Sequence, residues 1–107
     1  MIDTINDDNF HQQVIENRKP VVVIFEKCCW GAAHIVKPIL EKLAIDYTDD
    51  ICVFRYDLDE NSIFSKKYNV EDSTTVFVFN KGVIVNRTGV ISRDEFIKII
   101  NSIISIH

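Results

Sequence analysis

The sequence has few of the residues that interrupt regular structure: its 107 residues include 3 Gly and 2 Pro. Disordered and fibrous chains are rich in these residues, so both classes are excluded. The longest apolar run, residues 21–25, is much too short to cross a membrane. The first residues contain no apolar stretch of signal-peptide length, and we therefore expect no cleavable signal.

Positive charge is also scarce, because 12 Lys and Arg face 16 Asp and Glu, which gives a net charge of −4. Nucleic-acid binding needs a basic surface, and binding to an anionic membrane needs a basic amphipathic helix. We therefore expect neither partner. The three cysteines are an odd number and Cys28 and Cys29 are adjacent, which does not fit a secreted disulfide framework. The expected location is the reducing cytoplasm.

The apolar residues that are present predict one α/β domain over residues 1–107. Continuous β-branched runs predict buried strands at 21–25, 51–56 and 75–79. A more polar strand is expected at 83–88, antiparallel to its predecessor, because Asn80-Lys81-Gly82 suits a hairpin turn. Helical patterns lie between the strands, and helices between strands favour parallel pairs with right-handed crossovers.

Four helices are predicted, each from its cap or its periodicity. Asp7 or Asp8 should cap the first, with Phe10, Val14 and Ile15 on one face. A second begins near Gly31, contains Pro38, and spaces its apolar residues for one face: Ile35, Ile39, Leu43 and Tyr47. A short third lies near 62–68. The fourth opens with a capping box, Ser92-Arg93-Asp94-Glu95, and its apolar residues are Phe96, Ile99, Ile100 and Ile103.

Several segments, in this order, resemble the thioredoxin family over nearly the whole chain. They are Lys19 to Phe25, Lys37-Pro38-Ile39-Leu40, Val53 to Asn61, Tyr68-Asn69-Val70, Thr75 to Phe79, Asn80-Lys81-Gly82 and Gly89. The resemblance implies the thioredoxin fold, a mixed central β-sheet flanked by helices on both faces.

The resemblance also implies that the family's dithiol is missing. Counting without gaps from Phe25 and from Pro38 places Cys29-Trp30-Gly31-Ala32-Ala33 on the family's W-C-G-P-C segment. Trp30 and Ala33 then occupy the two cysteine positions, Ile24 the buried Asp position and Thr74 the cis-Pro position. A cis bond before Thr74 would cost about 2.5–4 kcal/mol, so we expect a trans bond there. Arg55, where the family often has Lys, is expected to pair elsewhere or to extend to solvent.

Cys28 and Cys29 leave three alternatives open. In the first, they have no redox role. Cys29, at a helix N-terminus that lowers a thiol pKa, could act as a monothiol nucleophile, with Cys28 as a strained and easily reduced vicinal partner. The two thiols and His34 could instead hold a soft metal, but three ligands fall short of a closed site. Otherwise His34 is expected on the helix surface, and Cys52 as a small buried apolar residue.

Two functions follow from these residues. The first is a protein- or peptide-binding module with little or no disulfide reductase activity, using a groove made by Trp30, Gly31, Ala32, Ala33, Ser73, Thr74, Gly89 and Val90. The alternative is a redox protein that uses Cys29, with Cys28, in thiol–disulfide exchange. We expect no cofactor and no metal for either function.

Overall fold

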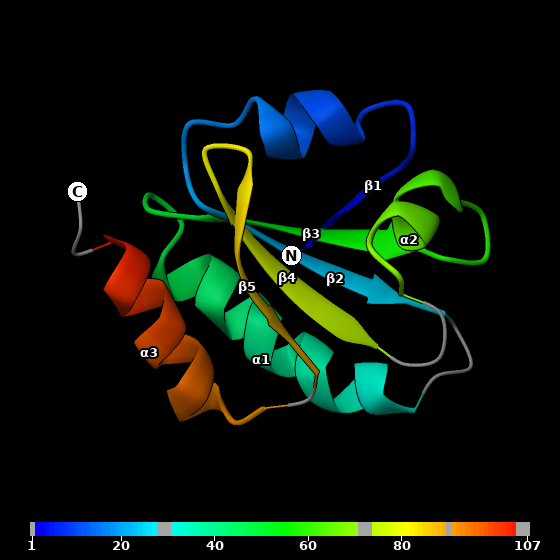
Figure 1. Cartoon of the computed structure of the whole chain (residues 1–107). Helices are drawn as coiled ribbons and strands as arrows, with labels where there is room; N and C mark the ends of the chain where they lie inside the picture. The colour runs from blue at the N-terminus through cyan, green and yellow to red at the C-terminus, as the bar shows by residue number, and fades with distance from the viewer. Residues whose placement is uncertain (1, 28–30, 71–73, 90, 105–107) are drawn as a thin grey trace.

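A computed structural model of the chain describes residues 2–27, 31–70, 74–89 and 91–104. The strands form one sheet, and the helices pack around it (Figure 1). The elements are β1 (Asp3–Ile5), η1 (His11–Ile15), β2 (Val21–Glu26), α1 (Ala32–Asp46), β3 (Cys52–Asp57), α2 (Ile63–Lys67), β4 (Thr75–Asn80), β5 (Val83–Thr88) and α3 (Arg93–Ile104).

The sheet is five-stranded and mixed, in the order β1-β3-β2-β4-β5. β1 and β2 both run parallel to β3, whereas β4 is antiparallel to β2 and to β5. The four predicted strands are therefore confirmed to within one residue at each end. β1 was not predicted: its three residues carry two polar side chains, so neither length nor alternation marks it as a strand.

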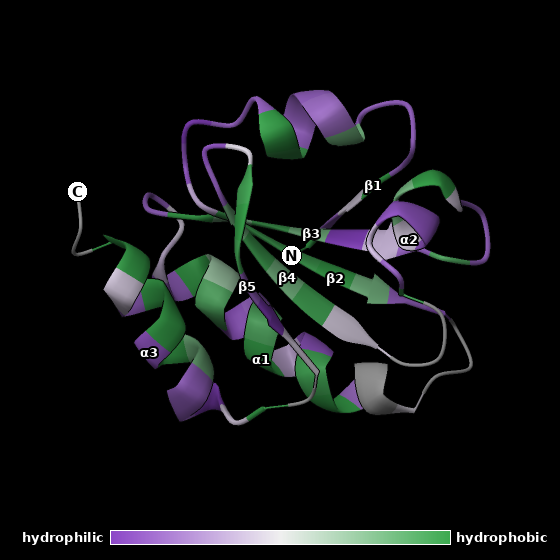
Figure 2. Ribbon diagram, in the orientation of Figure 1, coloured by the Kyte–Doolittle hydropathy of each residue, from purple (hydrophilic) through white to green (hydrophobic). Residues whose placement is uncertain are grey.

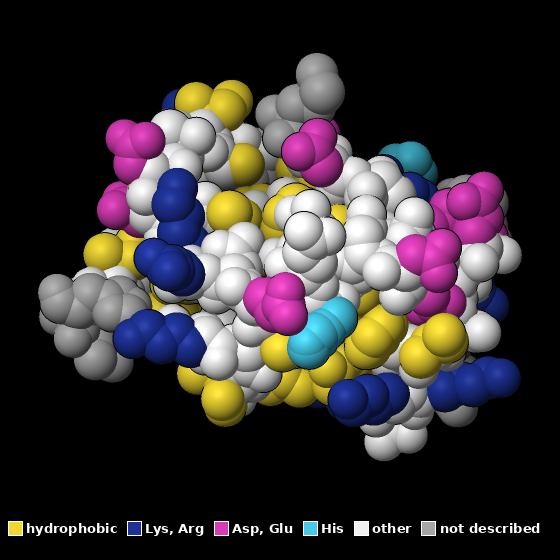
Figure 3. Space-filling view, turned by 90° about the horizontal axis from the view of Figure 1, so that it is seen from above, with side chains coloured by type: hydrophobic (Ala, Val, Ile, Leu, Met, Phe, Trp, Pro, Cys, Tyr) yellow, Lys and Arg dark blue, Asp and Glu magenta, His cyan; other side chains and the backbone are white. Residues whose placement is uncertain are grey.

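Helices cover both faces of the sheet, as the fold prediction required (Figure 1). One face carries an aliphatic core against α1 and α3, including Val22, Ile24 and Leu40, and Phe96 of α3 is its one buried aromatic residue among those described. The other carries an aromatic core beneath η1 and α2. Figure 2 shows the central strands as predominantly hydrophobic, which fits strands buried on both sides. On the outside, seen from the η1 side, acidic and basic side chains are interspersed (Figure 3).

The face predicted for the second helix is wrong only at its first position, Ile35. Leu43 is buried, and Ile39 and Tyr47 are partly buried against the same core. α1 has Gly31 as its N-cap and contains Pro38, as expected. However, Val36, Leu40 and Leu43 form its buried face, and Ile35 is 61% exposed. The predicted Ile35–Ile39–Leu43 series has the correct spacing, but so does the series that starts one residue later. Periodicity alone cannot choose between two such stripes when both are apolar.

The N-terminal helix is short, and its predicted cap is wrong. η1 is a single π-type turn whose N-cap, Phe10, makes no side-chain cap bond. Asn6 instead holds the preceding turn, because its Oδ1 accepts from the backbone N–H groups of Asp8 and Asn9. Asp7 points to another helix: its Oδ2 accepts from the N–H of Ser62 at 3.2 Å, at the start of α2.

The hairpin between β4 and β5 is confirmed. Lys81 and Gly82 both have positive φ, as in a type I′ turn, whose twist suits a two-residue hairpin. A Cβ at Gly82 would lie 2.9 Å from the carbonyl oxygen of Ile15, so glycine also lets the turn approach η1 closely.

The capping box of α3 is confirmed as well. The N–H of Glu95 donates to Ser92 Oγ at 3.2 Å, and Glu95 Oε1 accepts from the N–H of Ser92 at 3.5 Å. Phe96, Ile100 and Ile103 are buried and Ile99 is partly buried, which is the predicted face. Among the helices of the described residues, none combines the length and the apolar character that a bilayer crossing requires.

Candidate functional site

Four chain segments meet at one edge of the sheet, and the candidate site lies there (Figure 1). β2 ends at Glu26 and α1 begins with Gly31 as its N-cap. β4 begins at Thr75, and its antiparallel neighbour β5 ends at Thr88. The topology therefore brings the N-terminus of α1, Thr74 and Gly89 to the same end of the molecule.

The structure describes part of the predicted site. Gly31 is exposed, and the N–H of His34 donates to its carbonyl at 3.1 Å. Ala32 and Ala33 form the first turn of α1, Thr74 is buried, and Gly89 is exposed. His34 is exposed on the helix surface, as predicted. The other predicted site residues lie outside the described part of the chain: Cys28, Cys29, Trp30, Ser73 and Val90.

The bond between Ser73 and Thr74 involves one of those residues, so its trans geometry stays a prediction. Within the described ranges, no group of three or more His, Cys, Asp or Glu side chains could hold a metal ion. Cys28 and Cys29, the thiols of the metal alternative, lie outside the described residues.

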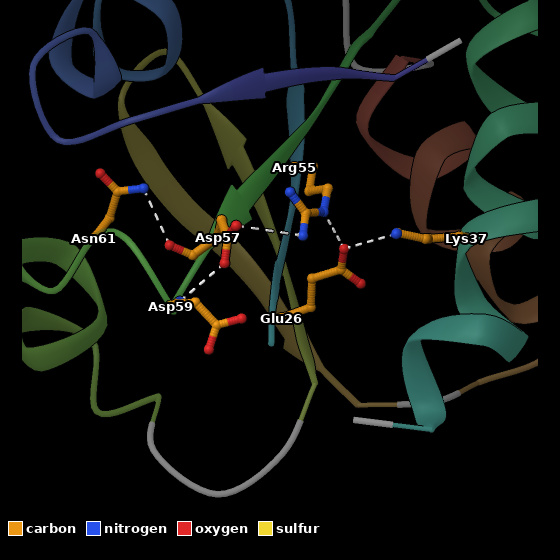
Figure 4. A network of polar contacts seen from close by, with 6 residues as sticks. All are labelled: Glu26, Lys37, Arg55, Asp57, Asp59 and Asn61. Carbon is orange, nitrogen blue, oxygen red and sulfur yellow. Dashed lines mark hydrogen bonds and ion pairs between the residues drawn. The ribbon is translucent and has the colours of Figure 1, made fainter. Parts of the chain in front are cut away.

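An ion-pair network with a buried carboxylate lies between the sheet and the N-terminal half of α1 (Figure 4). Its centre is Glu26, the last residue of β2, whose side chain is 1% exposed. Lys37 of α1 contacts Glu26 Oε1 at 2.9 Å, and Arg55 of β3 donates from Nε to the same oxygen. Arg55 also lies 3.6 Å from Asp57 Oδ2. The network thus joins β2, β3 and α1.

The network further favours the charged form of Arg55. Burial lowers the pKa of its guanidinium, but the hydrogen bond to Glu26 and the charges of Glu26, Asp57 and Asp59 outweigh burial and raise the pKa above its ordinary value. Arg55 therefore stays cationic and compensates a carboxylate that would otherwise be costly to bury. The expectation that Arg55 pairs with a residue other than Ile24 is confirmed.

Glu26 is the residue that sequence reasoning missed. Alternate residues of a strand share a face, and Val22 and Ile24 both belong to the aliphatic core under α1. Glu26 is the next residue after Ile24 on that face. The buried carboxylate therefore lies one inward-facing position beyond Ile24 along β2. A charged residue at the next inward-facing position of a buried strand was the available signal.

A second polar network fixes the β3–α2 connection beside the site. The Tyr56 hydroxyl donates to Asp7 Oδ1 and accepts from the N–H of Phe64 at 3.2 Å. Burial raises the pKa of Tyr56 above its ordinary value, and the hydrogen bond to Asp7 is the second-largest cause of the increase. Asp57 Oδ1 accepts from the N–H of Asp59 at 2.9 Å, and Asn61 Nδ2 donates to the Asp57 carbonyl at 3.0 Å (Figure 4).

A surface pocket of about 300 Å³ lies at the other end of β3, where residues of β1, η1 and the C-terminal end of α1 surround the start of the strand. It is lined by Asp3, Gln13, Ala44, Thr48, Ile51, Cys52, Val53 and Phe54. Cys52 was predicted to be buried, but it is only half-buried, because it lines this pocket. Asn17 Nδ2 lies 3.5 Å from its sulfur. The pocket is separate from the edge that carries the candidate site.

The fold and this edge of the sheet can be compared with known proteins. A model of the thioredoxin family matches residues 1–102. The chain belongs to the thioredoxin family. It is 28% identical to a thioredoxin of Acidithiobacillus ferridurans over 99 residues, which cover 92% of each chain.

Two further thioredoxins illustrate the range of similarity. A thioredoxin of Pyropia yezoensis is 27% identical over 105 residues, which cover 97% of this chain and 98% of the relative. Thioredoxin-T of Drosophila melanogaster is 38% identical over 78 residues, which cover 72% of this chain and 49% of the relative.

Proposed function

We propose that this thioredoxin-family domain binds an extended segment of a partner protein at the α1 end of the sheet, with little or no disulfide reductase activity. The observation that carries the proposal is the sequence of the active-site segment: Trp30 and Ala33 stand at the family's two cysteine positions. The segment therefore lacks the pair of thiols one helical turn apart with which an unstrained disulfide forms and a mixed disulfide is released.

The surroundings of this segment support a binding role. Gly31 and Gly89 are exposed, and apart from their neighbours in the chain no atom of the described residues lies within 4 Å of where a Cβ would be. Backbone N–H and C=O groups at such positions are accessible to an extended chain, which can bind by adding main-chain hydrogen bonds. Trp30 would supply the large aromatic contact that commonly anchors such a partner. We also propose that residues 1–107 form one domain and that it is located in the cytoplasm.

Reductase activity is tested by insulin precipitation with dithiothreitol as the electron source. We expect no acceleration over dithiothreitol alone. A clear acceleration that survives the double variant Cys28→Ser/Cys29→Ser would be an artefact of the assay. Acceleration that the double variant abolishes would overturn the proposal.

Binding is tested with insulin B chain whose cysteines have been alkylated, so that no covalent bond can form. In an NMR titration, the amide signals of Gly31, Thr74 and Gly89 should shift, and Trp30→Ala should abolish the shifts. Ile45→Ala is the matched control, because Ile45 is an apolar residue of α1 that is 62% exposed at the far end of the helix. Equal effects of the two variants would contradict the proposed surface.

A monothiol function is the second candidate, supported by two thiols that immediately precede a helix N-terminus. The first turn of α1 has no acidic residue that would oppose a thiolate there. In the proposed step, the Cys29 thiolate attacks a disulfide of a partner protein, one sulfur of that disulfide leaves as a thiolate, and a mixed disulfide forms. An external small thiol must then reduce it, with Cys28 as the other possible attacking group.

Maleimide labelling across a range of pH values separates the two candidates. A Cys52→Ser background removes the half-buried third thiol. If Cys29 is labelled completely at a pH well below 8.5, the result supports the monothiol function. If the labelling of Cys29 has the pH dependence of an ordinary thiol and the protein binds the peptide, the result supports the binding module alone.

A further inference from the structure

Two buried polar atoms at the candidate site have no hydrogen-bond partner among the described residues: Glu26 Oε2 and Thr74 Oγ1. Both side chains are almost fully buried, 1% exposed for Glu26 and 2% for Thr74. Buried polar atoms of native proteins nearly always have a partner, from the protein or from ordered water. Two such atoms at one place therefore point to a third group between them.

Extending the strand register by one residue beyond its last pair places these two residues opposite each other. β2 and β4 are antiparallel, with Ile24 opposite Val76 and Phe25 opposite Thr75. The next step of the same register pairs position 26 with position 74. Side chains that face each other across antiparallel strands share one face of the sheet, with Cβ atoms about 4.5–5.5 Å apart. Ile24 and Val76 lie in the aliphatic core, so Glu26 and Thr74 face the same side, toward α1.

The chemistry of the two atoms limits what can lie between them. Glu26 Oε1 already contacts two cations, Lys37 and Arg55, so a third cation at Oε2 is unnecessary for charge balance. Oε2 accepts hydrogen bonds, and a threonine hydroxyl both donates and accepts. The group they require is small, neutral, and both a donor and an acceptor.

We propose that Glu26 and Thr74 bind one buried water molecule at the edge of the sheet behind α1. The water donates to Glu26 Oε2, and its oxygen accepts from the Thr74 hydroxyl. A buried water is retained where at least two polar groups converge on it, which this pair provides. The water connects the end of β2 to the residue that precedes β4 through two hydrogen bonds. This role does not depend on the proposed peptide binding.

Thermal unfolding of Thr74 variants tests the site, because two explanations predict opposite signs. If the hydroxyl holds a water, Thr74→Val removes a satisfied group and leaves the water with one partner. We then expect the Tm to fall by about 4 °C or more. If the hydroxyl has no partner, Thr74→Val removes an unsatisfied polar group, and an unchanged or higher Tm would overturn the proposal.

Two further measurements keep the test independent of folding defects. Thr74→Ser keeps the hydroxyl, so it should retain most of the Tm that Thr74→Val loses. A crystal structure of the wild-type protein should show a water within about 3.2 Å of both oxygens. A Thr74 hydroxyl hydrogen-bonded directly to Glu26, or an empty space between the two oxygens, would refute the proposed water site.

Discussion

Arg55 of β3 and Glu26 of β2 form a charge pair in which the carboxylate is almost fully withdrawn from solvent. The guanidinium donates to Glu26 Oε1 and stays 21% exposed, whereas the glutamate side chain is 1% exposed. Lys37 reaches the same oxygen from α1 at 2.9 Å. The pair therefore connects two central strands and the helix whose N-terminus borders the candidate site.

Removing the cation of this pair should be strongly destabilising. Arg55→Met leaves Glu26 buried with Lys37 as its remaining cationic partner, and we expect the free energy of unfolding to fall by about 3–5 kcal/mol. Urea denaturation followed by far-UV circular dichroism measures the loss. Arg93→Met is the matched control, because its pair with Asp46 is exposed on both sides and should be worth less than about 1 kcal/mol. Equal losses in the two variants would contradict the role of burial.

Arg87 holds the edge strand β5 against the α2–β4 connection. Its guanidinium donates to the carbonyl of Tyr68 at 2.6 Å and to that of Asn69 at 3.0 Å, and it lies over the ring of Phe77. Lysine cannot form this two-pronged contact, so Arg87→Lys should cost about 1–2 kcal/mol. Hydrogen exchange of β5 amides should accelerate. Lys98→Arg, on the exposed surface of α3, should change neither quantity, and protection of β5 that survives Arg87→Lys would argue against the clamp.

The cap of α3 gives a prediction with an internal control. Ser92→Ala removes a side-chain acceptor from the N–H of Glu95 and should lower the free energy of unfolding by about 1 kcal/mol. Ser62 is also an N-cap, but it makes no side-chain cap bond at α2. Ser62→Ala should therefore have a much smaller effect in the same denaturation experiment. The reverse order would show that the capping box is not formed in solution.

The buried phenol of Tyr56 should make stability fall at high pH. Its pKa is raised above the ordinary value of 10.0 in the folded state, chiefly by burial. Below about pH 10 the phenol is protonated in both states, and above it the unfolded state loses a proton that the folded state retains. The free energy of unfolding should therefore decrease as the pH rises beyond about 10.

Urea denaturation at pH 9 and at pH 11 measures this effect. Tyr56→Phe should show a smaller loss between the two pH values than the wild-type protein. Tyr68, whose pKa burial also raises, contributes in the same direction and remains in both proteins. A loss of equal size in the variant would show that Tyr56 does not carry the alkaline sensitivity.

The comparison of α3 with α1 shows what the sequence could predict and why. At α3 a specific local signal, the capping box, fixes where the helix begins, and a single apolar stripe fixes its buried face. At α1 the start was equally clear, but Ile35 and Val36 begin two apolar stripes that local spacing cannot rank. The choice depends on the sheet against which the helix packs, which is tertiary information.

The candidate site has the same division. The strands and the helix that border it were predicted to within one residue, because order and local motifs determine them. The ion-pair network was not predicted, since Glu26, Lys37 and Arg55 come from three elements that are far apart in the sequence. Buried polar contacts between distant elements depend on geometry that no local pattern records.

The division of the core into an aliphatic and an aromatic half has a consequence for spectroscopy. Phe10, Phe25, Tyr56, Phe77 and Phe79 all belong to the half beneath η1 and α2. Methyl groups of Val14, Val21 and Val23 lie among these rings, whose magnetic shielding will displace their proton signals from those of methyls such as Val22 and Val78 across the sheet. Each side of the sheet thus has its own resolved reporters, and a single spectrum recorded during heating can show which side loosens first.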